Sequence, residues 1–268
     1  MDQSVNLSKP SRLYALVVTL MILGAAAMSL ISFEFLKEFY AEALPNSGAL
    51  LHSYPVAKGK DGRKISYELQ TTKPEQWRHL NQISKAAVAA VLASEDGGYY
   101  THNGYEPEAI RKAWALNRKL GRFAKGGSTI TQQVVKNIFL SPEKTISRKL
   151  REIILAVQLE RTVGKRKILE TYLNIAEWGP GIYGIEQAAR TYFAKSAAAL
   201  TAREGAILAF MLPNPKKYRN SLRGEDGLSE FGQHRVSDIL NRLWKTGKIS
   251  DDEFFSSSSL DSSASEQL

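Results

Sequence analysis

Two short segments of the chain carry side chains that can move a proton and bind an anion. Residues 95–104 place Glu95 and Asp96 a few positions before His102, and residues 126–133 read GGSTITQQ. A carboxylate with apolar neighbours can have its pKa raised into the range of a general base, and the N–H groups at the start of a helix suit a phosphate. Together the segments predict acid–base chemistry on a phosphorylated substrate.

The second segment predicts the start of a helix. Thr129 and Gln132 have the spacing of a capping box, and Lys136 follows two turns along, where it could reach the same anion. An ordinary capped helix without a ligand is the alternative interpretation. A P-loop is excluded, because the Gly-Lys-Ser/Thr ending is missing.

A further carboxylate, Glu152, lies one helical turn after Arg148. The two side chains could form no more than an intrahelical ion pair. Alternatively, Glu152 is a second functional carboxylate beside a cation, facing Glu95 across a cleft. Spacing alone leaves both interpretations open.

The apolar pattern predicts the helices that must position these residues. Apolar side chains recur at helical spacing in residues 77–94, 146–157, 168–176 and 236–244, and a capping box at Thr201–Glu204 opens a helix over 205–212. Glu95 would therefore end a buried helix. Residues 64–69 (KISYEL) form a weak strand candidate. Because convincing strands are few, the predicted fold class is mainly α-helical.

The chain of 268 residues carries a net charge of +9 and no cysteine. The positive charge favours an anionic partner, which could be a nucleic acid, a membrane surface or a phosphorylated ligand. The lack of cysteine excludes disulfide bonds and thiolate metal sites.

An uncharged, apolar run over residues 13–33 predicts one transmembrane helix, since about 20 such residues span a bilayer. Lys9 and Arg12 precede the run, so the positive-inside rule places the N-terminus in the cytoplasm. A signal peptide cleaved near residues 25–27 is the alternative, but the run continues well past those alanines. A buried core helix fits less well, because the run is apolar on every face.

Residues 111–125 hold basic side chains and no acidic one, interleaved with Trp114, Leu116, Leu120 and Phe123. Such a segment can lie in the headgroup layer of a membrane, with its aromatic side chains inward and its cations on lipid phosphates. A solvated basic helix or a nucleic-acid patch is the alternative.

These observations predict five consecutive regions. They are a cytoplasmic N-terminus (1–12), a transmembrane anchor (13–33), a juxtamembrane linker (34–60), one folded domain (61–250) and a disordered, serine-rich tail (251–268).

At these motifs the chain resembles the bacterial peptidoglycan glycosyltransferases, in particular the monofunctional transglycosylases, which are related to the N-terminal module of class A penicillin-binding proteins. The family's signatures occur in order, as Glu-Asp-x-x-aromatic-x-x-His-x-Gly at 95–104, Gly-x-Ser-Thr-Ile-x-Gln-Gln at 126–133, Arg-Lys-x-x-Glu at 148–152, Ile-Leu-Glu-x-Tyr-Leu-Asn at 168–174, and Arg-Thr-Tyr-Phe at 190–193 in place of Arg-x-x-Tyr-Phe.

The chain departs from the family's pattern at a few positions of the first motif. Tyr99 stands where phenylalanine is usual, and Glu106 where aspartate is usual; both keep shape or charge. Gly97 and Gly98 make the loop after Glu95 unusually flexible, which puts its pre-organisation in doubt.

The resemblance implies a lysozyme-like helical fold with a membrane-associated lobe, held at the bacterial inner membrane with the folded domain outside the cytoplasm. It also implies that the 4-hydroxyl of GlcNAc in lipid II attacks the anomeric carbon of a lipid-linked glycan chain, forming a β-1,4 linkage and releasing undecaprenyl diphosphate. The expected partners are lipid II, the growing glycan, membrane lipids and other cell-wall synthesis proteins, and no nucleic acid is expected.

Carried over by motif position, Glu95 is the general base on the acceptor hydroxyl. Glu152 would assist at the donor side, with a divalent cation (Mg²⁺ or Mn²⁺) on the diphosphate as one possibility. Lys136 and Arg148 would neutralise the leaving diphosphate. These cations replace the general acid of a glycosidase, because a diphosphate leaves readily once its growing charge is met.

The resemblance also implies supporting residues. Asp96 and His102 would support the Glu95 loop. The residues expected to position sugars and phosphates are Ser128, Thr129, Gln132, Gln133 and Asn137.

Two other functions stay open: a lysozyme-like enzyme that cleaves finished glycan, and a non-catalytic, basic module that scaffolds cell-wall proteins. A hydrolase has no diphosphate to neutralise, which argues against the first. Residues 141–144 (SPEK) and 245–247 (KTG) mimic transpeptidase motifs, but only about 100 residues separate them, which is too few for that domain. No acylation by penicillin is expected.

Overall fold

The computed structural model describes residues 12–40, 44–61, 64–121, 126–143, 145–218 and 228–262. The N-terminal residues 1–11, the end of the basic segment at 122–125 and residues 263–268 lie outside the described residues. Contacts divide the chain into two compact units, Met1–Leu44 with Lys144–Arg151, and Pro45–Glu143 with Glu152–Leu268.

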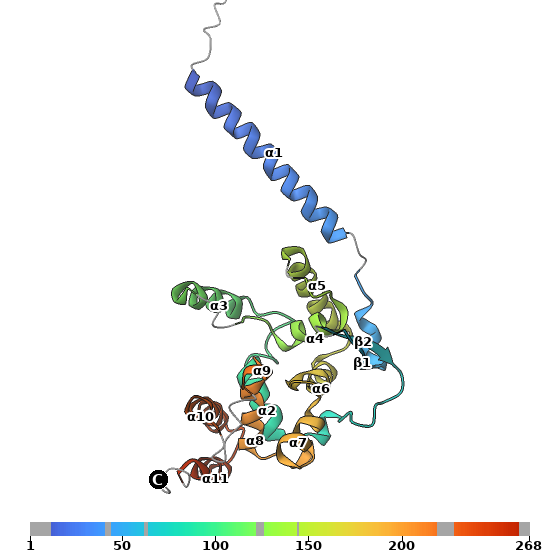
Figure 1. Ribbon diagram of the computed structural model, residues 1–268, viewed down its shortest axis with the longest axis vertical. Helices are drawn as coiled ribbons and strands as arrows, with labels where there is room; N and C mark the ends of the chain where they lie inside the picture. Colours follow the sequence, from blue (N-terminus) through green and yellow to red (C-terminus); the bar gives the residue numbers. More distant parts are fainter. Residues whose placement is uncertain are drawn as a thin grey trace, which may run out of the picture. The chain divides into compact units, whose positions relative to one another are not determined.

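The first unit contains the long helix α1, Arg12–Tyr40, and the first six residues of α5, Ile146–Thr162 (Figure 1). Within α1, Thr19–Lys37 is long and apolar enough to cross a membrane. This segment has a mean hydropathy of 1.8, and none of its residues is buried against the rest of the chain. The apolar helix predicted over 13–33 is therefore present, and it continues past Phe33 to Tyr40.

The second unit is mainly helical, as predicted. Its described helices and 3₁₀ turns (η) are η1 (Ser47–His52), η2 (Leu80–Gln82), α2 (Lys85–Glu95), α3 (Pro107–Leu120), α4 (Ile130–Phe139), the rest of α5, α6 (Lys165–Ile175), α7 (Ile185–Phe193), η3 (Ala197–Ala199), α8 (Ala202–Met211), α9 (Pro215–Tyr218), α10 (Glu230–Lys245) and α11 (Asp251–Ser262). Its strands form two antiparallel pairs, β1 (Tyr54–Asp61) with β2 (Lys64–Gln70), and β3 (Glu177–Gly179) with β4 (Ile182–Tyr183).

Helix α8 lies at the centre of the core, against α2 and α10. Thr201 and Glu204 form the predicted capping box at its start, and residues 205–211 are all buried. Gly205 lets the α2 backbone come very close, since a Cβ at this position would lie 2.5 Å from the Cα of Ala87. The α2–α8 contact therefore fixes the helix that ends at Glu95.

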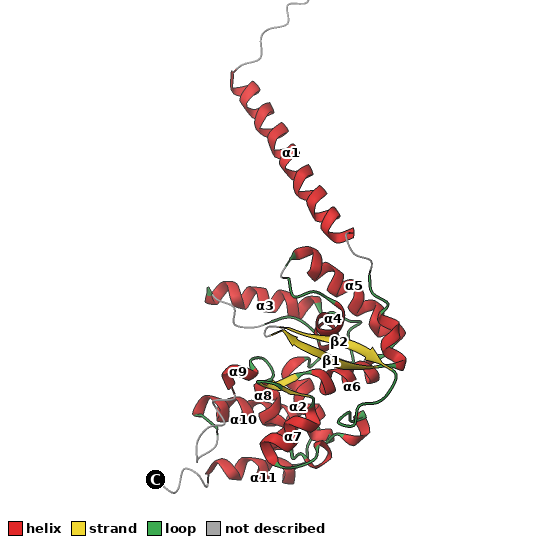
Figure 2. Cartoon of the chain, turned by 45° about the vertical axis from the view of Figure 1, so that its right-hand side comes forward, coloured by secondary structure: helices red, strands yellow, loops and turns green. Residues whose placement is uncertain are grey.

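The β1–β2 hairpin packs on α6 and α4 (Figure 2). Strand β2 confirms the prediction for residues 64–69, but the predicted linker over 34–60 is wrong, because it contains η1 and β1. The sequence of β1, YPVAKGKD, has little alternation of its own. It becomes a strand because β2 supplies its hydrogen-bonding partner, with Val56 opposite Glu68.

Two predicted boundaries need correction. Helix α2 begins at Lys85 rather than near Trp77, because the Ser84 hydroxyl accepts the Ala87 N–H and caps it there. The tail is helical over Asp251–Ser262 rather than disordered. Ser250 caps this helix, and Phe254 stacks on Trp244 with ring centroids 4.7 Å apart.

Replacing Gly205 by alanine should lower the free energy of unfolding by about 1–3 kcal/mol, because the new methyl group overlaps the α2 backbone. In a helix with free space around the glycine, the same change would raise the free energy of unfolding by up to about 1 kcal/mol. The sign of the change therefore shows whether the α2 backbone is this close. Gly232→Ala in α10 is the control, since its Cβ would meet only side-chain atoms, the nearest in Leu228 at 3.3 Å. Denaturant unfolding of the detergent-solubilised chain measures both variants. Equal stability of the two would contradict the close α2–α8 contact.

Candidate active site

Glu95 lies at the last position of α2, at the end of a buried helix as predicted. The neighbouring residues Ala90 and Val91 are buried in the core, while Glu95 itself is half-buried. Its Oε2 accepts a hydrogen bond of 2.9 Å from the Nε2 of Gln133 in α4. The carboxylate is thus held by a neutral donor.

The surroundings of Glu95 raise the pKa of its carboxyl group above the ordinary 4.5. Burial is the largest cause, and the adjacent Asp96 carboxylate acts in the same direction. The Gln133 amide and the nearby Lys136 ammonium favour the charged form and limit the rise. A carboxylate tuned upward in this way suits a general base.

Tyr172 of α6 sets the orientation of Gln133. Its phenol donates to the Oε1 of Gln133 at 3.3 Å, so the amide must present its NH₂ group to Glu95. Burial raises the pKa of Tyr172 well above 10, and the carboxylates of Glu95 and Asp96 add to the rise, so the phenol keeps its proton. The sequence placed Tyr172 in a motif but gave no sign of this role.

Asp96 ties the end of α2 to the start of α4. Its Oδ2 accepts the backbone N–H of Ile130 at 2.9 Å, and its two oxygens lie 3.0 and 3.1 Å from the Nε2 of His102. The N–H of Gly104 donates to the Nδ1 of His102, so the ring proton lies on Nε2 and is donated to Asp96. These contacts hold the loop that follows Glu95.

The start of α4 differs from the expected phosphate site. Thr129 and Gln132 form the predicted capping box, and both are buried, with 2% and 0% of their surface exposed. The Ile130 N–H is already bonded to Asp96. An internal carboxylate therefore accepts one of the N–H groups expected for an anionic ligand, and its negative charge is favourable at this end of the helix dipole. In the structure Thr129 and Gln132 hold the helix.

Glycine at position 104 allows the loop to lie directly on α5. Its φ is +96°, and a Cβ there would lie 2.7 Å from the backbone carbonyl carbon of Ala156. Its carbonyl accepts the hydroxyl of Thr129 at 2.7 Å. Buried Glu152 lies one turn before Ala156, so it shares the face of α5 on which the loop packs.

Arg148 and Glu152 belong to different units, because the division of the chain falls within α5. The action of Arg148 on an anion near Glu95 therefore stays a prediction. Glu152 lies in the same unit as Glu95, and a cleft shared by these two carboxylates is likewise still a prediction. Among the other predicted residues, Gln133, Lys136 and Asn137 share one face of α4. Lys136 is exposed, and Gln133, Asn137 and Ser128 are half-buried.

A second polar cluster, which the sequence did not indicate, anchors the loop from α5 and α6. Glu160 accepts the Thr131 hydroxyl at 2.6 Å and the Lys165 ammonium at 2.8 Å. Tyr99 donates to the Lys165 carbonyl at 2.7 Å, and the Lys165 ammonium lies 4.5 Å from the centre of its ring. Tyr99 is buried, so the loop is fixed immediately after the flexible Gly97 and Gly98.

The motif at 168–174 holds the segment before α2. Glu170 accepts the indole N–H of Trp77 at 2.9 Å and the Leu80 N–H at 3.1 Å. One turn later, Asn174 pairs with both backbone groups of Arg78. Helix α6 thus carries Tyr172 toward Glu95 and fixes the chain that leads into α2.

The described residues contain no group of three or more His, Cys, Asp or Glu side chains that could hold a metal ion. A divalent cation at a diphosphate would take most of its ligands from the phosphates, as Mg²⁺ commonly does. Glu152 is the carboxylate that the family resemblance suggests for such a cation, and this role stays a prediction.

The family comparison agrees with the motifs and with this geometry. The chain belongs to the transglycosylase family, whose model, described as Transglycosylase, matches residues 61–243. The match covers the site and most of the second unit.

Three similar proteins have the same name. A biosynthetic peptidoglycan transglycosylase of Paraburkholderia xenovorans (strain LB400) is 44% identical over 173 residues, 63% of this chain and 72% of that protein. One of Bordetella avium (strain 197N) is 44% identical over 189 residues, 67% and 74% of the two chains. One of Nitrosomonas europaea (strain ATCC 19718) is 52% identical over 143 residues, 53% and 59% of the two chains.

The raised pKa of Glu95 makes stability depend on pH. Below the unfolded-state value of 4.5 both states hold the proton; as the pH rises through 4.5 toward the folded-state pKa, stability is lost. Glu95→Gln cannot ionise, so it should be more stable than the natural chain at neutral pH, with a difference that shrinks toward pH 4. Thermal unfolding across pH tests this.

The exposed Glu75 provides the control for this experiment. Glu75→Gln should change stability by no more than about 0.5 kcal/mol at any pH. The contrary result is a Glu95→Gln variant that loses stability relative to the natural chain as the pH rises from 4 to 7. The charged carboxylate would then stabilise the fold.

Proposed function

We propose that this chain is a peptidoglycan glycosyltransferase that polymerises lipid II. The observation that carries the proposal is the half-buried Glu95, whose pKa is raised and which has the Lys136 ammonium nearby. A base beside a cation suits a reaction in which a hydroxyl loses a proton and a phosphate leaves. The family match and the printed names of the relatives support the substrate class.

The proposed reaction joins two sugars. The 4-hydroxyl oxygen of the acceptor GlcNAc bonds to the anomeric carbon of the donor chain, while the bond from that carbon to the diphosphate oxygen breaks. Attack from the opposite face inverts the carbon and gives a β-1,4 linkage. Glu95 takes the hydroxyl proton as the bond forms, which is typically worth about 10²–10⁴-fold in rate. Undecaprenyl diphosphate leaves with the bonding electrons.

The leaving diphosphate needs fixed positive charge. Lys136 supplies it from the exposed face of α4, and Arg148 is assigned to the same task by its motif. Ser128 and Asn137 are the polar residues with accessible surface that would contact sugars or phosphates. Gln133 would orient the base, to which it already donates.

The proposal includes an anchored enzyme. We infer that α1 holds the chain in the bacterial inner membrane, with the N-terminus in the cytoplasm and the second unit outside it. On α3, Trp114 is 62% exposed and Leu120 45%, beside basic side chains, which supports contact with lipid headgroups.

External protease should cleave the second unit in spheroplasts but not in intact cells, because the proposed orientation places this unit outside the cytoplasm. Cleavage only after lysis would contradict this orientation.

Glu95→Gln should reduce polymer formation from labelled lipid II by about 10²–10⁴-fold, because the acceptor proton loses its base. Glu75→Gln, which removes an exposed carboxylate, should retain full activity. Gel analysis of the products measures both variants. Polymerisation by Glu95→Gln at the natural rate would contradict the assignment, and release of muropeptides from sacculi without polymer from lipid II would favour a lytic enzyme.

The same assay tests the cation. We propose that Glu152 acts at the donor diphosphate, with a divalent ion as its link to the phosphates. A chelator should then abolish polymerisation, and Mg²⁺ or Mn²⁺ should restore it. Full activity in the presence of the chelator would show that no divalent cation is needed. Lys136 and Arg148 would then neutralise the diphosphate by themselves.

A further inference from the structure

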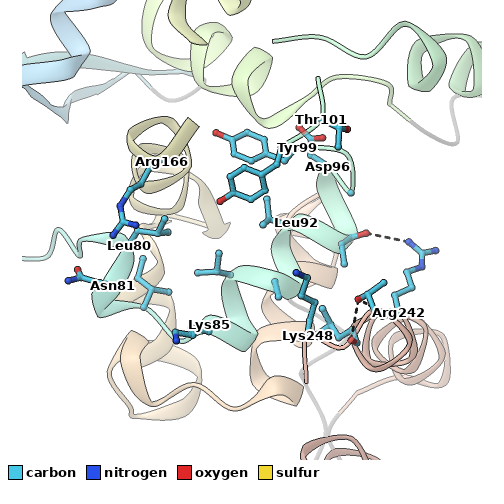
Figure 3. A pocket seen from close by; sticks show the side chains of 18 residues that line it. Leu80, Asn81, Lys85, Leu92, Asp96, Tyr99, Thr101, Arg166, Arg242 and Lys248 are labelled. Atoms are coloured by element: carbon cyan, nitrogen blue, oxygen red, sulfur yellow. Dashed lines mark hydrogen bonds between the residues drawn. The ribbon is translucent and has the colours of Figure 1, made fainter. Parts of the chain in front are cut away.

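A groove of about 790 Å³ runs along α2 next to the candidate active site (Figure 3). Its α2 wall is formed by residues such as Val88, Ala89 and Leu92, which share one face of the helix. Asp96 and Gly97 continue this wall. The groove therefore reaches the residues that directly follow Glu95.

The groove combines an apolar floor with a cationic rim. Leu80, Ile83 and Leu243 join the α2 face in the floor. The rim cations come from four places in the sequence and are Lys85, Arg166, Arg242 and Lys248. Among the described residues that line the groove, Asp96 alone is acidic, and its carboxylate is bonded to Ile130 and His102. The groove thus suits a ligand with small apolar groups and several negative charges.

We propose that this groove binds the acidic peptide that a peptidoglycan precursor carries. This inference rests on the proposed function and deepens it. The peptide hangs from the sugar next to the one whose hydroxyl reacts, so it must leave the site close to Glu95. Its alanine methyl groups suit the floor, and its carboxylates suit the rim.

Two details place the peptide there. A Cβ at Gly97 would meet no atom within 4 Å, so the groove wall is uncrowded two residues after Glu95. On the opposite wall, Arg242 donates from Nη1 to the Ala93 carbonyl at 3.4 Å, which holds its guanidinium at the edge. Its other N–H groups can donate hydrogen bonds to a carboxylate.

The test compares two substrates, lipid II with its complete peptide and lipid II with the peptide cut back to its first residue. Arg242→Ala should raise KM for the complete substrate by about two- to fivefold, the size of one exposed ion pair, and leave KM for the shortened one unchanged. The kcat should not change with either. Adding Lys248→Ala should raise KM for the complete substrate further.

Lys245→Ala is the matched control. Lys245 is exposed on the same helix and does not line the groove, so the variant loses the same charge and should behave as the natural chain. An equal rise in KM for both substrates, or no rise at all, would overturn the inference. If the natural chain polymerises neither substrate, the proposed function itself fails.

A binding measurement keeps the inference testable should Arg242→Ala misfold. The free precursor peptide, titrated into the natural chain, should shift NMR signals of residues 97–101, and the Lys245→Ala chain should show the same shifts. Absence of shifts at millimolar peptide would overturn the inference.

Discussion

Two consecutive carboxylates at the end of α2 meet the start of α4, and the candidate site depends on this contact. Asp96 accepts the N–H of Ile130, and Glu95 accepts the amide of Gln133 one turn further along. The C-terminal end of a helix is electronegative, so two carboxylates there are unfavourable by themselves. The N-terminal end of α4 offsets that cost at Asp96. Burial nevertheless raises the pKa of both carboxyl groups, and at Glu95 only the neutral Gln133 donor and the Lys136 cation limit the rise.

The different contacts of Glu95 and Asp96 explain why the surrounding motifs are needed. Asp96, His102 and Gly104 form one hydrogen-bonded loop that lies on α5, while Tyr172 reaches Glu95 through Gln133. The Gly97–Gly98 pair, which the sequence marks as flexible, lies between buried Asp96 and buried Tyr99. The loop is therefore held on both sides of the glycines, and Gly97 forms part of the groove wall.

The sequence predicted the parts of this arrangement that are local. Capping boxes at Thr129 and Thr201, the helical class of the fold and the place of Glu95 at a helix end follow from spacing alone. It could not predict contacts that depend on tertiary packing. Strand β1 forms only because β2 pairs with it. Tyr172 and Glu160 bind residues that are distant in the sequence. The sequence predicted an anion site at the start of α4 because the carboxylate that binds the Ile130 N–H, Asp96, comes from the end of α2.

The most direct measurement of this account is the titration of the Glu95 side chain by carbon-13 NMR of its carboxyl group, assigned by its loss in Glu95→Gln. The account predicts a pKa above 4.5, and a further rise in Gln133→Leu, which removes the amide donor. A pKa at or below 4.5 in the natural chain would contradict it, because Glu95 would then be a stabilised carboxylate and a weak base.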